Sequence, residues 1–205
     1  TALEGSGYVD ETIELPNAGS ERFFPEDTVD NFVDMFKDDT RVDGIISRIG
    51  VFLPAMNIAT NRTESRMTVR GYQANRQDGF GDILNLSGDQ SIRISDLRED
   101  EIILNWNAAD VLGARIGDSV SIYAPTGVTS FKVRFIAKHG GLASGGDTKL
   151  ILMSLAQLQD LTTRHGLIDW IGVSNQGGIE EGLSLSKEIG QELRIALVDK
   201  SIARQ

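Results

Sequence analysis

Apolar positions recur along the chain with two different spacings, which predict a mixture of helices and strands. Val29, Phe32, Val33 and Phe36 stand at i, i+3, i+4 and i+7, the spacing of one face of a helix. The Pro-Glu-Asp sequence at residues 25–27 suits the start of that helix. Proline is tolerated in the first turn, and carboxylates favour the positive end of the helix dipole.

Strand-like segments surround this helix. Residues 49–58 and 63–72 predict a hairpin that turns at Asn61-Arg62, and Pro54 predicts a bulge or an edge in its first strand. The polar, glycine-rich segment 73–90 indicates a boundary between two subdomains. Further strands are expected at residues 8–15, 102–104, 119–123, 129–137, 150–152 and 170–173.

Capping signals place the later helices. Asn107, with Asp110 three residues later, predicts the start of a helix over residues 108–115, and Gly117 is expected to end it in a left-handed conformation. Ser154 and Gln157 form a second capping box.

The helix that starts at Ser154 is expected to end at His165-Gly166, a cation followed by a glycine. A final helix is expected from about residue 179.

The charge balance and the missing residue types narrow the classes of function. Twenty Lys and Arg residues against 30 Asp and Glu give a net charge of −10, and no basic stripe of the kind that binds a phosphate backbone is present. The same charge disfavours an anionic lipid surface. The absence of cysteine excludes disulfides, thiolate zinc ligands and a thiol nucleophile. We expect no nucleic-acid partner.

No segment reaches the roughly 18 apolar residues needed to cross a bilayer. The first residues do not have the pattern of a signal peptide. Because the chain starts at Thr1 and not at Met, we expect it to be a processed product or a part of a longer protein.

A glycine-rich loop and two histidines are the first candidates for chemistry. Loop 140–146 has bare backbone amides that could cradle phosphate, but a phosphate loop ends in Gly-Lys-Ser/Thr and here Asp147 follows. His139 with its two glycines is similar to the oxyanion loop of esterases, whose G-x-S-x-G motif the sequence lacks. His165 is explained as a cation at a helix end. We interpret the loop as a flexible connection and neither histidine as catalytic.

Residues 184–187 match the S-x-x-K nucleophile motif of penicillin-recognising enzymes. The S-D-N and K-T-G motifs that accompany it are absent, so Ser184 is expected to lie near a helix start. The sequence therefore predicts no catalytic residue and no enzyme activity.

Acidic residues at 26–27, 38–39, 99–101 and 180–181 offer paired acids or calcium ligands, but helix ends and turns account for them. Segment 39–44 has the Asp and Gly of an EF-hand, with Arg41 at a ligand position and Gly50 in place of the final Glu. We expect no metal site and no cofactor.

Two glycosylation sequons begin at Asn61 and Asn85 and matter only in a secretory pathway. Trp106 and Trp170 flank strands, which favours core packing over exposed anchors for a partner.

The order of elements from residue 101 to residue 197 resembles a known family. The helix 108–115 followed by Gly117-Asp118 and strand 119–122 resembles the "helix, then Gly-Asp-x-V" element of MacB-like periplasmic core domains. The return strand 131–137, the strand 150–152 with its Ser-headed helix, the segment 168–173 and a closing helix follow in the family's order. Before residue 101 the resemblance extends only to the order of elements.

The resemblance implies an α+β fold and a non-catalytic role. It implies a porter-like α/β lobe built from residues 1–74 and 147–205, with residues 75–146 inserted as a small β-rich subdomain. Domains of this family are the extracytoplasmic parts of ABC-transporter permeases of the MacB, LolC/LolE and FtsX type. A separate cytoplasmic ATPase domain or subunit would hydrolyse ATP, and the full transporter would be a dimer at the cell membrane. Gly117-Asp118 would be architectural, with the aspartate bonded to local backbone amides.

The leading hypothesis is an extracytoplasmic permease domain that couples ATP-driven membrane movement to a partner protein or an exported substrate. An alternative is an extracytoplasmic ligand-binding sensor domain, which requires a pocket with convergent polar groups. The third is a hydrolase that uses Ser184 or His139, which we rank last. No residue pattern identifies the partner-binding residues.

Overall fold

The computed structural model describes residues 9, 11–14, 23–138, 140–176, 185 and 188–192. The helices within this part are α1 (Thr28–Phe36), α2 (Trp106–Leu112), α3 (Leu155–Thr162) and the short 3-10 helices η1 (Ala74–Arg76), η2 (Ile94–Asp96) and η3 (Gly141–Ala143). The strands are β1 (Glu11–Glu14), β2 (Phe24–Pro25), β3 (Val42–Asn57), β4 (Thr63–Tyr72), β5 (Ile83–Leu84), β6 (Ser91–Ile92), β7 (Glu101–Asn105), β8 (Ser119–Ala124), β9 (Gly127–Ala137), β10 (Leu150–Ser154), β11 (Leu167–Ile168) and β12 (Trp170–Asn175).

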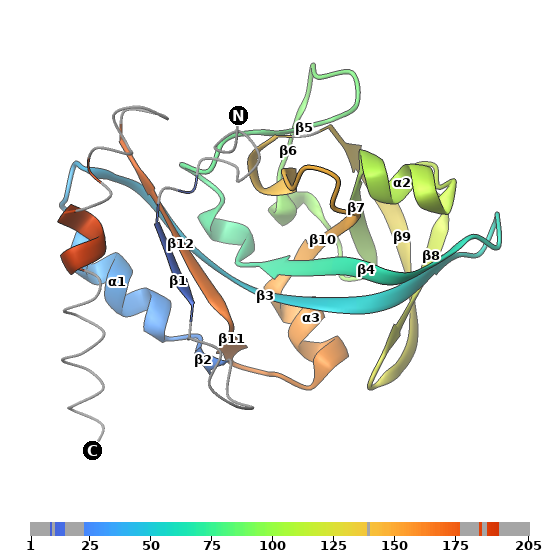
Figure 1. Ribbon diagram of the computed structural model, residues 1–205, viewed down its shortest axis with the longest axis horizontal. Helices are drawn as coiled ribbons and strands as arrows, with labels where there is room; N and C mark the ends of the chain where they lie inside the picture. Colours follow the sequence, from blue (N-terminus) through green and yellow to red (C-terminus); the bar gives the residue numbers. More distant parts are fainter. Residues whose placement is uncertain are drawn as a thin grey trace.

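The long strand β3 joins two parts of one sheet. The strand order is β1-β12-β3-β4-β10-β7-β9-β8, and β8 pairs with the far end of β3, so the last six strands close into a small barrel. The first half of β3 pairs instead with β12, which carries the sheet out of the barrel toward β1 and α1. Figure 1 shows β3 running between these two parts, with α1, β1 and β12 on the left and α2, β8 and β9 on the right. The chain is therefore a mixed α+β domain with a six-stranded barrel.

The barrel takes strands from both of the expected subdomains. β3, β4 and β10 belong to residues 1–74 and 147–205, whereas β7, β8 and β9 belong to residues 75–146. The antiparallel pairs β10–β7 and β3–β8 join the two sets by backbone hydrogen bonds. One continuous sheet thus crosses both expected boundaries, and the division into a lobe and an insert stays a prediction.

Two apolar clusters lie on the two faces of the barrel wall. The larger one fills the interior with alternate residues of the strands and receives α1, α2 and α3 at its margins. The smaller cluster covers the outer face of β7 and β10. Residues from the glycine-rich segment 73–90, including the fully buried Phe80 and Ile83, form part of this outer cluster. The segment is therefore a packed cover of the barrel and not an open connection.

Several local predictions are confirmed. Helix α1 buries Val29, Phe32 and Phe36, the stripe expected from the spacing. The hairpin β3–β4 turns at Asn61, which has φ 55°, and its register shifts between Leu53 and Ala55, where Pro54 stands.

The predicted ends of two helices are wrong. The N-cap of α2 is Asn105 and not Asn107, and its C-cap is Gly113, with φ 57°, and not Gly117. Strand β7 runs as far as Asn105, so the chain turns into the helix two residues earlier than expected.

Helix α3 has the predicted Ser154–Gln157 capping box but ends at Thr162, three residues before His165. Its left-handed C-cap is Thr163, whose amide bonds Asp160 and Gln159 carbonyls. Of the expected last helix, residues 185 and 188–192 are helical, and its other positions lie outside the described residues.

Candidate functional site

The candidates for catalysis do not form a site in the described part of the chain. His139, Ser184 and Lys187 lie outside the described residues. Loop 140–146 was expected to be flexible, but within it Gly141–Ala143 forms η3, with Leu142 and Ala143 buried against the outer face of the barrel. A Cβ at Gly141 would meet the Gly81 carbonyl oxygen at 2.7 Å, so close backbone packing explains this glycine.

Of the acidic candidates, residues 180–181 lie outside the described part of the chain, and Asp39 is engaged in a turn and an ion pair. Asp39 accepts hydrogen bonds from the Arg41 backbone amide at 2.9 Å and from Arg41 Nη2 at 2.6 Å. The Arg41 hydrogen bond is the main cause that lowers the pKa of Asp39. No group of three or more His, Cys, Asp or Glu side chains with metal-binding geometry occurs among the described residues.

Gly117-Asp118 organises the end of the barrel next to α2. The Asp118 carboxylate accepts the Arg115 amide at 2.9 Å and the amide side chain of Asn57 at 3.1 Å. Asn57 is fully buried and also donates to the Leu112 carbonyl at 3.3 Å. The expected local bonding of Asp118 is thus confirmed, and the segment holds the last residues of α2 to the hairpin.

Asn105 ties the other end of α2 to the neighbouring strand. Its side-chain oxygen accepts the amides of Ala108 at 2.9 Å and Leu150 at 3.0 Å, and its side-chain nitrogen donates to the Thr148 carbonyl at 2.7 Å. Asn107, the expected cap, reaches Gly146 from the surface instead. A buried asparagine that satisfies three backbone groups leaves no polar atom free for a ligand.

An apolar surface lies at this end of the barrel. Trp106 is 50% exposed, and Leu86 and Ile116 beside it are also exposed. Together they line a hollow of about 630 Å³ whose rim carries Arg62 and Arg115. We call Leu86, Trp106 and Ile116 the Trp106 surface. Grouped exposed apolar side chains with a polar rim are typical of protein contact sites.

Trp106 and Trp170 have different environments. Trp170 is 6% exposed, packs edge-on against Tyr72 and belongs to the outer cluster, as expected. For Trp106 the expectation of core packing is wrong. Trp106 is the first residue of α2, directly after the cap residue Asn105. The residues of this helix that are buried, Ala108, Ala109 and Leu112, come later.

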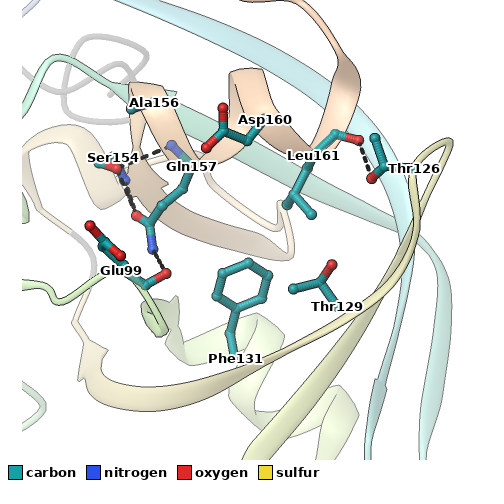
Figure 2. Close-up of a pocket in the computed structure, with 9 residues that line it drawn as sticks. All are labelled: Glu99, Thr126, Thr129, Phe131, Ser154, Ala156, Gln157, Asp160 and Leu161. Carbon is teal, nitrogen blue, oxygen red and sulfur yellow. Dashed lines mark hydrogen bonds between the residues drawn. The ribbon is translucent and has the colours of Figure 1, made fainter.

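A second hollow, of about 450 Å³, lies against α3 at the opposite end of the barrel. Figure 2 shows Leu161 of α3 and Phe131 of β9 pointing toward each other, with Ser154, Gln157 and Thr126 around them. Gln157 accepts from the Ser154 amide and donates to the Glu99 carbonyl at 2.8 Å, and Thr126 donates to the Leu161 carbonyl at 3.0 Å. These polar groups satisfy the backbone, so they do not converge on a ligand.

The sequence matches no protein-family model, and no curated protein matches it. The fold is similar to that of two solved transporter domains. The extracellular domain of the noncanonic ABC-type transporter YknZ from Gram-positive bacteria superposes with a TM-score of 0.56 at 11% identity, over 87% of this chain and 88% of that chain. The periplasmic region of MacB from Actinobacillus actinomycetemcomitans superposes with a TM-score of 0.59 at 10% identity, over 95% of this chain and 86% of that one.

The chain therefore has the fold of the extracytoplasmic domains of MacB-type ABC transporters, as its sequence resemblance implied. None of the helices in the described part has both the length and the apolar character that a bilayer crossing requires.

Proposed function

We propose that the chain is the extracytoplasmic domain of an ABC-transporter permease and that it couples ATP-driven movement in the membrane to a partner protein or an exported substrate. The observation that carries this proposal is the shared fold over 86–88% of two transporter domains. In this role the domain is not an enzyme and binds no nucleic acid. An ABC ATPase outside this chain drives it, and the full transporter is a dimer.

The Trp106 surface is our candidate for the contact with that partner. Its three apolar side chains come from α2, from the connection between β5 and β6 and from the segment before β8, and Asn105 and Asp118 fix the two ends of α2. A rigid tryptophan in a shallow hollow is the kind of anchor that dominates binding energy at protein interfaces. The alternative of a ligand-binding sensor has less support, because the polar groups around the α3 hollow bond the backbone.

Membrane topology and nucleotide coupling test the proposal. The gene should encode a transmembrane helix on each side of this segment, and an alkaline phosphatase reporter fused within the segment should be active outside the cytoplasm. The full-length protein should copurify with an ABC ATPase. A reporter active only in the cytoplasm contradicts the proposal.

The Trp106 surface has its own test in the purified transporter. We expect Trp106→Ala to weaken partner-stimulated ATP hydrolysis, with a loss of about 2 kcal/mol in partner binding. Met35→Ala is the matched control, because Met35 is 49% exposed on α1 at the other end of the molecule. Equal stimulation of both variants and the unchanged protein would remove the Trp106 surface from the partner interface.

A further inference from the structure

Three arginines share the outer face of the β3–β4 hairpin. Arg70 alternates on β4 with Met67 and Val69 of the barrel interior, so it points outward. Arg48 stands outward on β3, and Arg66 lies with its guanidinium 4.6 Å from the ring centre of the exposed Phe52. We call Arg48, Arg66 and Arg70 the arginine face.

Gly50 leaves open space between two of these arginines. The register places Gly50 directly opposite Arg70, and Arg48 is two residues earlier on the same face. A Cβ at Gly50 would lie 3.5 Å from Arg48 Nη1. Besides Arg48 Nη1, only Asp169 Oδ2, at 3.8 Å, would come within 4 Å of that Cβ, so the position between Arg48 and Arg70 has room for an incoming carboxylate.

The protein holds Arg48 in place without neutralising it. Its guanidinium carbon lies 4.6 Å from the ring centre of Trp170, a ring that packs over Gly172. Burial is the main cause that lowers the pKa of Arg48, and the charge of Arg70 lowers it further, whereas Tyr72, Asp169 and Glu14 act in the opposite direction. The Nε atoms of Arg48 and Arg70 are buried and have no hydrogen-bond partner in the described structure.

Two carboxylates lie near the arginine face and reduce its positive charge. Asp169 accepts the Gly50 amide at 2.9 Å, and burial raises its pKa. The second carboxylate is that of Glu14 on β1, whose charge acts on Arg48. No ion pair joins a described carboxylate to Arg48, Arg66 or Arg70. The face therefore keeps net positive charge in a chain whose net charge is −10.

We propose that the arginine face binds an extended acidic peptide segment of a partner protein. Arg66 and Arg70 are four residues apart on one strand, about 13 Å, which is farther than one carboxylate or phosphate spans. Carboxylates on alternate peptide residues meet both ends of the row, and Phe52 offers an apolar contact between them. The acidic remainder of the chain repels such a segment and confines it to this face. This inference rests on the proposed function only for the identity of the partner.

Peptide binding to the 205-residue chain tests the inference. The probe is a fluorescent ten-residue peptide with glutamate at every second position, and the matched peptide carries glutamine there. By anisotropy we expect the glutamate peptide to bind at least about tenfold more tightly, with an affinity that falls as salt rises. Arg70→Gln should weaken binding about fivefold or more, and Asp169→Asn should strengthen it about threefold. Arg93→Gln is the control, because Arg93 pairs with Asp78 on the cover of the barrel and should not matter.

Each contrary outcome overturns the inference. Equal binding of the glutamine peptide excludes recognition of carboxylates, and unchanged binding by Arg70→Gln excludes this face. Displacement by inorganic phosphate at the same concentration as the peptide indicates a small-anion site. Tighter binding to phosphatidylglycerol vesicles than to the peptide indicates a lipid surface. Since Arg48→Gln disturbs the packing of Trp170, the Arg70 and Asp169 variants decide the result. Failure of the topology test leaves this peptide result unaffected.

Discussion

Two strand–helix units, β7–α2 and β10–α3, close opposite ends of the barrel in different ways. β7 and β10 are antiparallel neighbours, so the helices that follow them lie at opposite ends. Both helices begin at a polar cap, Asn105 or Ser154, and both end at a left-handed residue. Both bury apolar side chains in the interior cluster.

The ends differ in what they show to solvent. Around α3, Ser154 accepts an amide of the helix itself, Gln157 donates to the segment before β7, and Thr126 donates to the Leu161 carbonyl of α3. Around α2, the buried side chain of Asn105 bonds the backbone from the interior of the protein, and Trp106 is half exposed. The same local arrangement therefore leaves mainly polar side chains bonded to the backbone at the α3 end and exposed apolar side chains at the α2 end.

The largest expected effect separates the two caps. Asn105→Ala leaves the buried amides of Ala108 and Leu150 without acceptors, and we expect a loss of about 3 kcal/mol in the free energy of unfolding. Ser154→Ala removes a half-buried cap, and about 1 kcal/mol is expected. Urea denaturation followed by circular dichroism measures both. Equal losses would show that the two caps contribute equally to the free energy of unfolding.

The next comparison is between Gln157, which bonds neighbouring backbone at the α3 end, and Trp106, which is half exposed at the α2 end. Gln157 donates to three carbonyls before and at the start of β7 and caps α3, so Gln157→Ala should cost about 2 kcal/mol of stability. Trp106→Ala, at the α2 end, should change stability by less than about 1 kcal/mol because half of its side chain already faces water. Thermal denaturation of both variants gives the ranking. A larger loss for Trp106→Ala would mean that the indole is structural.

The sequence predicts elements whose signals are local, and it fails where distant segments decide. The stripe of α1, the Asn61 turn and the Ser154–Gln157 box depend on residues within a few positions of each other. Asn107 with Asp110 fits a capping box equally well, and only the pairing of Asn105 with Ala137 on β9 shows that the strand continues to Asn105.

The closure of the barrel and the arginine face are likewise invisible in local patterns. The pairs β4–β10 and β3–β8 join segments far apart in the chain, and alternation reveals a strand without naming its neighbour. The exposure of Trp106 follows from this closure. The arginines of the hairpin alternate with apolar residues as in any half-buried strand, so only the register shows that Gly50 lies between them.

The C-caps offer changes of opposite sign. Gly113 has φ 57°, and a Cβ there would also meet Arg62 Cδ at 3.3 Å, so Gly113→Ala should destabilise the protein by about 1–2 kcal/mol. Thr163 is a β-branched residue at φ 54°, and Thr163→Gly should stabilise by up to about 1 kcal/mol. Chemical denaturation distinguishes the two. Destabilisation by Thr163→Gly would mean that its hydroxyl bond to the Thr162 carbonyl outweighs the strain.

The smallest expected effect concerns an ion pair near the α2 end. Asn105 donates a hydrogen bond to the Thr148 carbonyl, and Lys149 is the next residue. The Lys149 ammonium donates to the Glu64 carboxylate on β4. This hydrogen bond is the main cause that lowers the pKa of Glu64. A carboxylate with a lowered folded-state pKa stabilises the protein above its unfolded pKa, and that contribution is lost as the pH falls through the folded value.

Glu64→Gln should therefore lower the free energy of unfolding at pH 7 by about 0.5 kcal/mol, a small value because Lys149 is partly exposed and screened by solvent. The difference from the unchanged protein should shrink as the pH falls below about 4.5, where the unfolded carboxyl takes up a proton. Urea titrations at pH 7 and pH 3 measure it, with Asp160→Asn, from the exposed pair with His165 at the α3 end, as the control. A difference that is the same at both pH values would assign the effect of Glu64 to packing and not to its charge.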